Sequence, residues 1–253
     1  TLEHAASAAL KLGYRFFDTA QIYGNASAIG RGVLLSDLPR AEIFISSKIW
    51  TSHRSYDGVM RAFTDIIEQL KTTYLDQLLI HWPATQGEPM IWQSQNAGTW
   101  RALEDLYEQG AVKVIGVSNF LPHHLVPLLA RARIRPMVNQ REIHRGSPQF
   151  AADNFCFTQN IAVQPWSPLG RGGLTHHPLL IELGEKYGVS PALIALRWSL
   201  QHGFIPVVKA LDAEHMKSNL DAFGLTLEDE DMTRLDTMQQ VAFSGLHPDT
   251  VTF

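Results

Sequence analysis

Short apolar segments alternate with amphipathic ones along the chain, and this alternation restricts the fold more than any other feature of the sequence. Apolar and β-branched runs predict seven buried strands, over residues 14–18, 42–47, 77–81, 112–117, 136–140, 161–165 and 204–208. Apolar residues at helical spacing predict helices over residues 2–12, 57–72, 99–108, 122–130, 148–159 and 191–201. Strands that alternate with helices pair in parallel through right-handed crossovers, so we expect a parallel α/β fold.

Two architectures are built from such units, an open doubly wound sheet and a closed (β/α)8 TIM barrel. An open sheet that binds a dinucleotide carries G-x-G-x-x-G after its first strand, whereas residues 19–24 here are TAQIYG. We therefore predict the barrel, with seven strands in this chain and the eighth preceding Thr1, because the chain opens with a helix. No Pro-, Gly- or Ser-rich linker interrupts the pattern, so residues 1–253 are expected to form a single barrel domain.

Composition argues against several classes of partner. The chain has 21 Lys and Arg residues against 25 Asp and Glu, a net charge of -4, whereas nucleic-acid binding requires a strongly basic face. No apolar run reaches the roughly 18 residues of a membrane span. The single cysteine, Cys156, precludes an internal disulfide and is typical of a reducing compartment. We expect a cytoplasmic protein with no nucleic-acid or membrane partner.

Polar side chains gather at the carboxyl ends of the predicted strands, which form the active face of a (β/α)8 barrel. Burying such groups separately costs several kcal/mol each unless they are paired, so their concentration at one face indicates a functional site. They are Asp18, Lys48, His81, Ser118, Asn119, Gln140, Glu142, His144, Trp166, Ser167 and Lys209, with Tyr23 in the loop after the first strand.

Four of these residues form a coherent proton donor. A phenol titrates near pH 10, and a neighbouring ammonium lowers that pKa, while a carboxylate beside the ammonium fixes its position. Tyr23, Lys48 and Asp18 supply these groups, and His81 could orient a carbonyl oxygen against the phenol. The set predicts protonation of an oxygen as a hydride reaches the carbon bonded to it.

Six stretches resemble the aldo-keto reductases, in the order and spacing of that family: GYRFFDTAQIYGN at 13–25, SSKIW at 46–50, LLIHWP at 78–83, IGVSNF at 115–120, VNQREIH at 138–144 and PWSPLGRG at 165–172. The resemblance covers essentially the whole chain, without the family's amino-terminal hairpin and first barrel strand. It implies a barrel that binds a nicotinamide dinucleotide, and it maps the family's catalytic residues onto Asp18, Tyr23, Lys48 and His81, with Tyr23 as the general acid. Diketogluconate reductases and prostaglandin F synthase-like members are the most similar branches.

The resemblance also implies a set of cofactor contacts. Ser118, Asn119 and Gln140 match the positions that bind the carboxamide, and Trp166 stands where a ring stacks on the nicotinamide. The remaining positions are Ser167, Leu169 and Arg171 for the pyrophosphate, and Lys209, His215 and Asn219 for the adenosine 2′-phosphate. Ala210 and His215 replace the family's usual Ser and Arg, so we expect NADPH to bind more weakly and with more pH dependence, with NADH as the alternative cofactor.

These expectations together describe a monomeric, metal-independent, NADPH-dependent reductase of small aldehydes or ketones. Trp50 and Trp82 are expected to line the substrate pocket, which residues 83–98 and the tail after residue 243 would shape. Two alternatives remain open at this point. One is a reductase-like protein that binds the cofactor with little or no turnover, and the other is a metal-dependent hydrolase that uses Glu142, His144, His81 and Asp18.

Overall fold

The structure is a computed structural model that describes residues 1–83, 91–144, 150–239 and 241–251. Two compact units make up the chain, residues 1–139 with 247–253, and residues 140–246. Residues 84–90 of the predicted substrate loop and 148–149 of a predicted helix lie outside the described residues. Of the helices that are described, none is both long and apolar enough to span a membrane.

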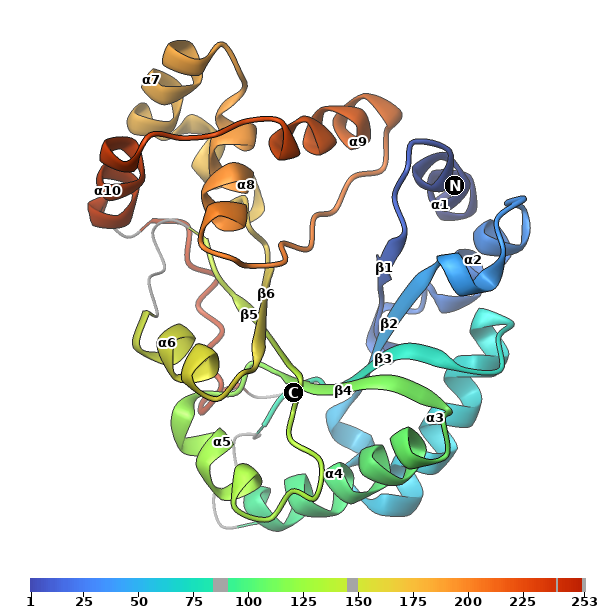
Figure 1. Cartoon of the computed structure of the whole chain (residues 1–253). Helices are drawn as coiled ribbons and strands as arrows, with labels where there is room; N and C mark the ends of the chain where they lie inside the picture. The colour runs from blue at the N-terminus through green and yellow to red at the C-terminus, as the bar shows by residue number, and fades with distance from the viewer. Residues whose placement is uncertain (84–90, 145–149, 240, 252–253) are drawn as a thin grey trace. The chain divides into compact units, whose positions relative to one another are not determined.

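The first unit contains parallel strands in chain order, drawn from blue to green in Figure 1. The strands are β1 (Phe16–Asp18), β2 (Phe44–Ile49), β3 (Leu75–Ile80) and β4 (Val112–Ser118), and β5 (Val138–Glu142) begins here and ends in the second unit. The helices are α1 (Leu2–Lys11), α2 (Ala26–Leu34), α3 (Tyr56–Leu70), α4 (Trp92–Glu108) and α5 (Pro122–Leu129), with the 3-10 turns η1 (Gln21–Tyr23), η2 (Arg40–Glu42) and η3 (Thr51–His53).

The parallel register brings the carboxyl ends of these strands to one edge of the sheet. Asp18 is aligned with Ser46, and Lys48 with Leu79. Every residue of β3 is buried, as expected for a strand covered on both faces. The polar side chains that the sequence places after successive strands therefore leave the sheet at the same edge.

The described residues of the second unit continue the strand and helix alternation with β6 and five α-helices. Its elements are α6 (Phe150–Thr158), β6 (Ala162–Trp166), η4 (Gly170–His176), α7 (Pro178–Tyr187), α8 (Pro191–Gln201), α9 (Ala213–Leu220), η5 (Asp221–Phe223) and α10 (Asp229–Thr237). Helix α8 has the bounds predicted from the sequence, because Ser190 caps it and Pro191 occupies its first position.

The seventh predicted strand, over residues 204–208, is reduced to a single bridge between Val207 and Trp166. The Ile205 and Val207 N–H groups donate to the Val163 and Pro165 carbonyls at 3.0 and 2.8 Å. The missing N–H of Pro206, between them, would face the edge away from β6, so this segment lacks that donor for a strand on its other side. The described residues thus contain six strands where seven were expected, and the segment still runs alongside β6.

Helix α2, which the sequence did not predict, packs closely because it contains two glycines. A Cβ on Gly30 would lie 2.6 Å from the Leu70 carbonyl oxygen, and one on Gly32 would lie 2.6 Å from the Ala6 Cβ. Glycine lowers helix propensity by about 1 kcal/mol, which weakens the sequence signal for this helix. The close approach to Leu70 and Ala6 nevertheless requires glycine at both positions. Helices α7, α9 and α10 were also not predicted.

Candidate active site

A buried ion pair joins the ends of β1 and β2. The Lys48 side chain is fully buried, and its ammonium forms an ion pair with the Asp18 carboxylate and donates to the Thr19 carbonyl at 3.1 Å. Asp18 also accepts a 2.9 Å hydrogen bond from the Ser46 hydroxyl, which in turn accepts one of 2.9 Å from Gln77 Nε2. A buried ammonium is tolerated when it is paired and hydrogen-bonded in this way.

Tyr23 lies over this ion pair. It ends η1, where Gly24 adopts a left-handed φ of 61°, and the Lys48 ammonium lies 5.2 Å from the centre of the Tyr23 ring. The side chain is 49% exposed. Partial burial raises the pKa of the Tyr23 phenol above its ordinary value of 10, Lys48 opposes this, and Asp18 adds to it. Lys48 acts in the predicted direction, but the net shift of the phenol pKa is upward rather than downward.

His81, directly after β3, is a neutral imidazole against the phenol ring. Its side chain is 6% exposed, and its Nδ1 forms no hydrogen bond within the described part of the chain. The ring meets Tyr23 and Trp50 edge-on, with centroids 5.7 and 5.0 Å apart, and Trp82 stacks at 6.4 Å. Burial, and then the Lys48 charge, hold the pKa of His81 well below 6.5. The imidazole can therefore donate a hydrogen bond without carrying a charge.

Ser118 and Asn119 continue the same edge at the end of β4. Both side chains are buried, and Asn119 adopts a left-handed φ of 63°. The Asn119 amide donates to the His81 carbonyl at 2.9 Å and to the Ser118 hydroxyl at 3.2 Å. The first unit thus brings together all four predicted catalytic residues, both predicted substrate-contacting tryptophans, and two of the predicted cofactor contacts.

The second unit carries the other predicted cofactor contacts. Gln140 in β5 donates to Gln164 of β6 at 3.3 Å. Trp166 ends β6 and bridges in parallel to Val207, so the segments that lead to Ser167 and to Lys209 leave the same end of this ladder. The sequence places these two predicted phosphate-binding segments about 40 residues apart, and the ladder makes them neighbours.

The loop after β6 has features that fit an anionic group. Ser167 has a left-handed φ of 51°, and Gly170, Arg171 and Gly172 are left-handed in succession. Leu169 anchors the loop on an apolar cluster of Leu193, Leu196 and Ala222. Arg171 and Lys209 are exposed, and neither forms an ion pair with any residue that the structure describes. Backbone turns of this kind with unpaired cations suit the phosphates of a dinucleotide.

His215 is exposed at the start of α9 and is paired with an acid. Asp212 caps the helix by accepting from the His215 backbone N–H at 2.9 Å, and its other oxygen lies 2.5 Å from His215 Nδ1. This pairing raises the pKa of His215 above 6.5. His215 therefore carries more positive charge near neutral pH than an ordinary histidine, but with a carboxylate beside it. Asn219 lies half-buried on the same helix.

The carboxylates of the hydrolase alternative have other partners. Glu142 accepts from the Ser244 N–H at 3.0 Å and from the Ser244 hydroxyl, and lies 3.1 Å from His144 Nε2. Asp18 is bound by Lys48. A metal ion at either carboxylate would have to displace a bonded partner, and at Asp18 that partner is itself a cation.

One cluster in the described residues has the spacing of metal ligands, namely His123, His124 and Asp249. His124 Nε2 lies 2.8 Å and His123 Nε2 lies 3.0 Å from Asp249 Oδ1. The Leu121 N–H donates to His124 Nδ1 at 3.1 Å, so the ring proton of neutral His124 lies on Nε2 and is donated to Asp249. The hydrogen bonds account for this cluster without a metal ion.

Ser46 and Gln77 are contacts that sequence reasoning missed. The serine pair before Lys48 carried a signal, because Ser46 and Lys48 are two residues apart on one strand and so face the same side. Arg54 was missed as well, and it donates to the Trp82 and Pro83 carbonyls at 2.6 and 3.3 Å. These bonds hold the chain directly after His81.

Comparison with known sequences identifies relatives over nearly the whole chain. The model of the Aldo/keto reductase family matches residues 2–240. The glyoxal reductase of Bacillus subtilis is 40% identical over 98% of this chain and 87% of its own length. The 9,11-endoperoxide prostaglandin H2 reductase of Trypanosoma cruzi is 38% identical over 95% of this chain and 83% of its own length.

Solved structures agree with the sequence relatives. The aldo-keto reductase MGS-M4, from a Medee basin deep-sea metagenome library, has a TM-score of 0.94 and 33% identity, covering 100% of this chain and 92% of its own. A mutant of Gox0644 in complex with NADPH has a TM-score of 0.91 and 35% identity, covering 99% of this chain and 89% of its own.

Proposed function

This chain belongs to the aldo-keto reductase family, and on that premise we propose that it reduces small aldehydes or ketones to alcohols with NADPH. The fold class predicted from the sequence, a (β/α)8 barrel, is the fold of this family. The observation that carries the proposal is the buried Lys48–Asp18 pair beneath the Tyr23 phenol, with the neutral His81 ring beside it. A relative named glyoxal reductase and a similar structure in complex with NADPH support it.

Tyr23 is the proposed proton donor. When hydride reaches a carbonyl carbon, the oxygen becomes an alkoxide, which is a far stronger base than a phenolate. A phenol whose pKa is raised can therefore still transfer its proton, and it stays protonated throughout the neutral pH range. The Lys48 ammonium stabilises the phenolate that remains. His81, neutral and buried, donates a hydrogen bond that orients the carbonyl oxygen.

The residues present fit a nicotinamide dinucleotide, which when bound supplies the hydride. Ser118, Asn119 and Gln140 are proposed to bind the carboxamide, and Trp166 to stack on the ring. The loop of Ser167, Leu169 and Arg171 is proposed to hold the pyrophosphate, and Lys209, His215 and Asn219 the 2′-phosphate. The Arg171 and Lys209 cations, which form no ion pair with the described residues, support the phosphate assignments.

The substrate side of the site is aromatic. Trp50 and Trp82 both contact the His81 ring, so we propose that they line the pocket for the carbonyl compound. A small carbonyl is favoured by the relative named glyoxal reductase. The cytoplasmic location, the monomeric state and the single domain predicted from the sequence stay predictions.

The test is NADPH consumption by the purified protein with a panel of aldehydes and ketones that includes glyoxal. The native protein should oxidise NADPH, and Tyr23→Phe should lose turnover while its affinity for NADPH, measured by quenching of tryptophan fluorescence, stays nearly unchanged. Tyr107→Phe on α4 is the matched control and should behave like the native protein. Native turnover in Tyr23→Phe would contradict the proposed mechanism. NADPH binding without oxidation over the whole panel would instead favour a binding protein with little or no turnover.

A further inference from the structure

A cavity of about 310 Å³ lies behind the strand that carries Lys48. Ser47 and Lys48 are successive residues of β2, so their side chains point to opposite faces of the sheet. Lys48 reaches Asp18 and Tyr23, whereas Ser47 lines the cavity together with residues of η1 and α3. The cavity therefore lies on the other face of β2 from Lys48, although Trp50, a proposed substrate contact, also lines it. Its volume is at the lower end of small-molecule pockets.

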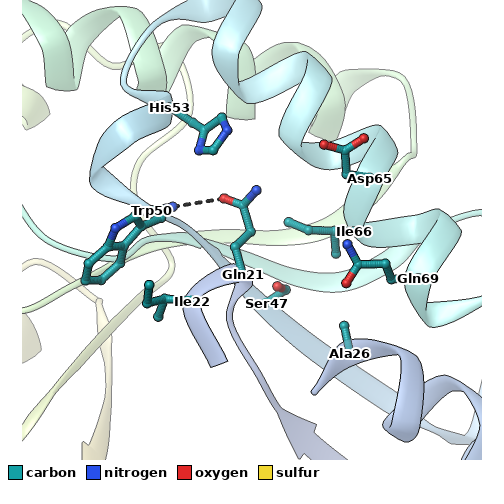
Figure 2. A pocket seen from close by; sticks show the side chains of 9 residues that line it. All are labelled: Gln21, Ile22, Ala26, Ser47, Trp50, His53, Asp65, Ile66 and Gln69. Atoms are coloured by element: carbon teal, nitrogen blue, oxygen red, sulfur yellow. Dashed lines mark hydrogen bonds between the residues drawn. The ribbon is translucent and has the colours of Figure 1, made fainter. Parts of the chain in front are cut away.

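Two polar side chains in the cavity have hydrogen-bonding capacity to spare. Ser47 is 1% exposed, and its hydroxyl has no hydrogen-bond partner among the described residues. Leaving such a group without a hydrogen bond is unfavourable, and a ligand hydroxyl could supply the missing partner. Figure 2 shows the Gln21 side chain extending across the cavity, where its amide oxygen accepts from the Trp50 N–H at 3.1 Å. The Gln21 amide nitrogen donates to none of the described residues and is free to donate to a ligand.

The charge of the lining selects the kind of ligand. Asp65 is the carboxylate among the nine lining residues, and no Lys or Arg is among them. Asp65 forms no ion pair with the described residues, and Figure 2 places it with Gln69 on the α3 side of the cavity. An unpaired carboxylate favours a cation and disfavours an anion. Ile22 and Ile66 add apolar surface to the lining.

We propose that this cavity binds a small primary amine that also carries a hydroxyl group. The ammonium pairs with Asp65, the hydroxyl hydrogen-bonds to Ser47, and the hydrocarbon part packs on Ile22 and Ile66. Such a ligand would contact Gln21 and Ile22, which precede Tyr23 in η1, and Trp50, which meets the His81 ring. The site does not depend on the proposed reductase function, because none of its polar contacts is a proposed catalytic group.

Three probes with one carbon skeleton test the charge requirement by isothermal titration calorimetry without cofactor at pH 7. Leucinol is a cationic amino alcohol, 4-methylpentane-1,2-diol is its neutral analogue, and 2-hydroxy-4-methylpentanoate is its anionic analogue. We expect leucinol to bind one to one, about two- to fivefold more tightly than the diol, as expected for one exposed ion pair, and the anion not to bind. No binding of leucinol, or equal binding of all three probes, would overturn the proposal.

Variants locate the bound probe. Asp65→Asn should lower leucinol affinity to that of the diol, whereas Glu68→Gln on the same helix should change nothing. Ser47→Ala should weaken leucinol and the diol together, and Ser47→Val should abolish binding by filling the space. Ser199→Ala removes another buried hydroxyl that has no hydrogen-bond partner among the described residues, and it should have no effect. Tyr23→Phe should bind leucinol as the native protein does. Native affinity in Asp65→Asn and Ser47→Val, or loss of affinity in Tyr23→Phe, would place the probe elsewhere and reject the site.

Discussion

The Ser46 hydroxyl donates a 2.9 Å hydrogen bond to the Asp18 carboxylate, the same carboxylate that pairs with the Lys48 ammonium. Ser46 and Lys48 are two residues apart on β2 and so lie on one face of the strand. Gln77, aligned with Ser46 in the parallel register, donates to the Ser46 hydroxyl at 2.9 Å. A chain of hydrogen bonds from β3 thus positions the ion pair beneath Tyr23.

Replacement of Ser46 by alanine should lower turnover because Asp18 loses a donor to its charged form. A hydrogen bond to a charged group contributes about 1.5–3 kcal/mol, so we expect kcat to fall about tenfold or more, with little change in KM for NADPH. Steady-state kinetics over a range of pH would measure both parameters and any displacement of the alkaline limb. Ser199→Ala is the matched control. Native kcat and a native pH profile in Ser46→Ala would show that Ser46 does not position the ion pair.

The raised pKa of Tyr23 sets the direction of the pH dependence. Reduction needs the phenol, and a pKa above 10 keeps the phenol protonated as pH rises through the neutral range. We expect kcat/KM for the carbonyl substrate, measured at saturating NADPH, to be flat through neutral pH and to fall only above about pH 10. Oxidation of the corresponding alcohol needs the phenolate and should increase over that same alkaline range. A fall in reduction between pH 7 and 9 with no change in substrate hydration would contradict this assignment.

His215→Arg should strengthen NADPH binding. Arginine offers a fixed charge and a bidentate fork, while the native imidazole is occupied by Asp212. We expect KM for NADPH to fall about three- to tenfold, and KM for NADH, which lacks the 2′-phosphate, to stay the same. The native KM for NADPH should rise as pH increases above the raised pKa of His215, and the arginine variant should lose this dependence. An equal change in KM for both cofactors would show that His215 does not bind the 2′-phosphate.

His124 should make the fold sensitive to acid. Its side chain is 1% exposed, it packs edge-on against Trp92 and Phe120, and burial lowers its pKa to about 4. Between pH 6.5 and 4 the unfolded chain binds a proton that the folded chain does not. The contribution of neutral His124 to the free energy of unfolding is therefore fully present above pH 6.5 and is lost as the pH falls toward 4. The loss attributable to His124 is up to about 3 kcal/mol.

The measurement is urea unfolding at pH 7.5 and pH 4.5 for the native protein and for His124→Asn. The asparagine oxygen can accept from the Leu121 N–H in place of Nδ1, and it does not titrate in this range. The variant should therefore lose less stability on acidification than the native protein. The same loss in both proteins would assign the acid sensitivity to other groups, such as Asp249, whose pKa is lowered by its histidine partners although its own burial opposes them.

Local patterns in the sequence were sufficient for much of the fold. Helix α8 was predicted with its observed bounds because a serine cap and a proline mark its start. Helix α2 was not predicted, because Gly30 and Gly32 weaken the local helix signal. These glycines are needed for the close packing of α2 against Leu70 and Ala6, which are distant in the sequence. The strand at 204–208 was predicted longer than it is, because an apolar run does not reveal that only Val207 forms a bridge, with Trp166 about 40 residues away in the sequence.

By itself, the sequence determined the alternation of strands and helices, the family, and the kinds of side chain at the strand ends. The period of apolar residues and the order of short motifs are properties of neighbouring positions in the chain. Only the tertiary structure decided that the pKa of Tyr23 is raised, that Asp212 occupies His215, and that Ser46 and Gln77 support Asp18. Each of these depends on distance and burial, because electrostatic and hydrogen-bond energies act through space between groups that the chain alone does not bring together.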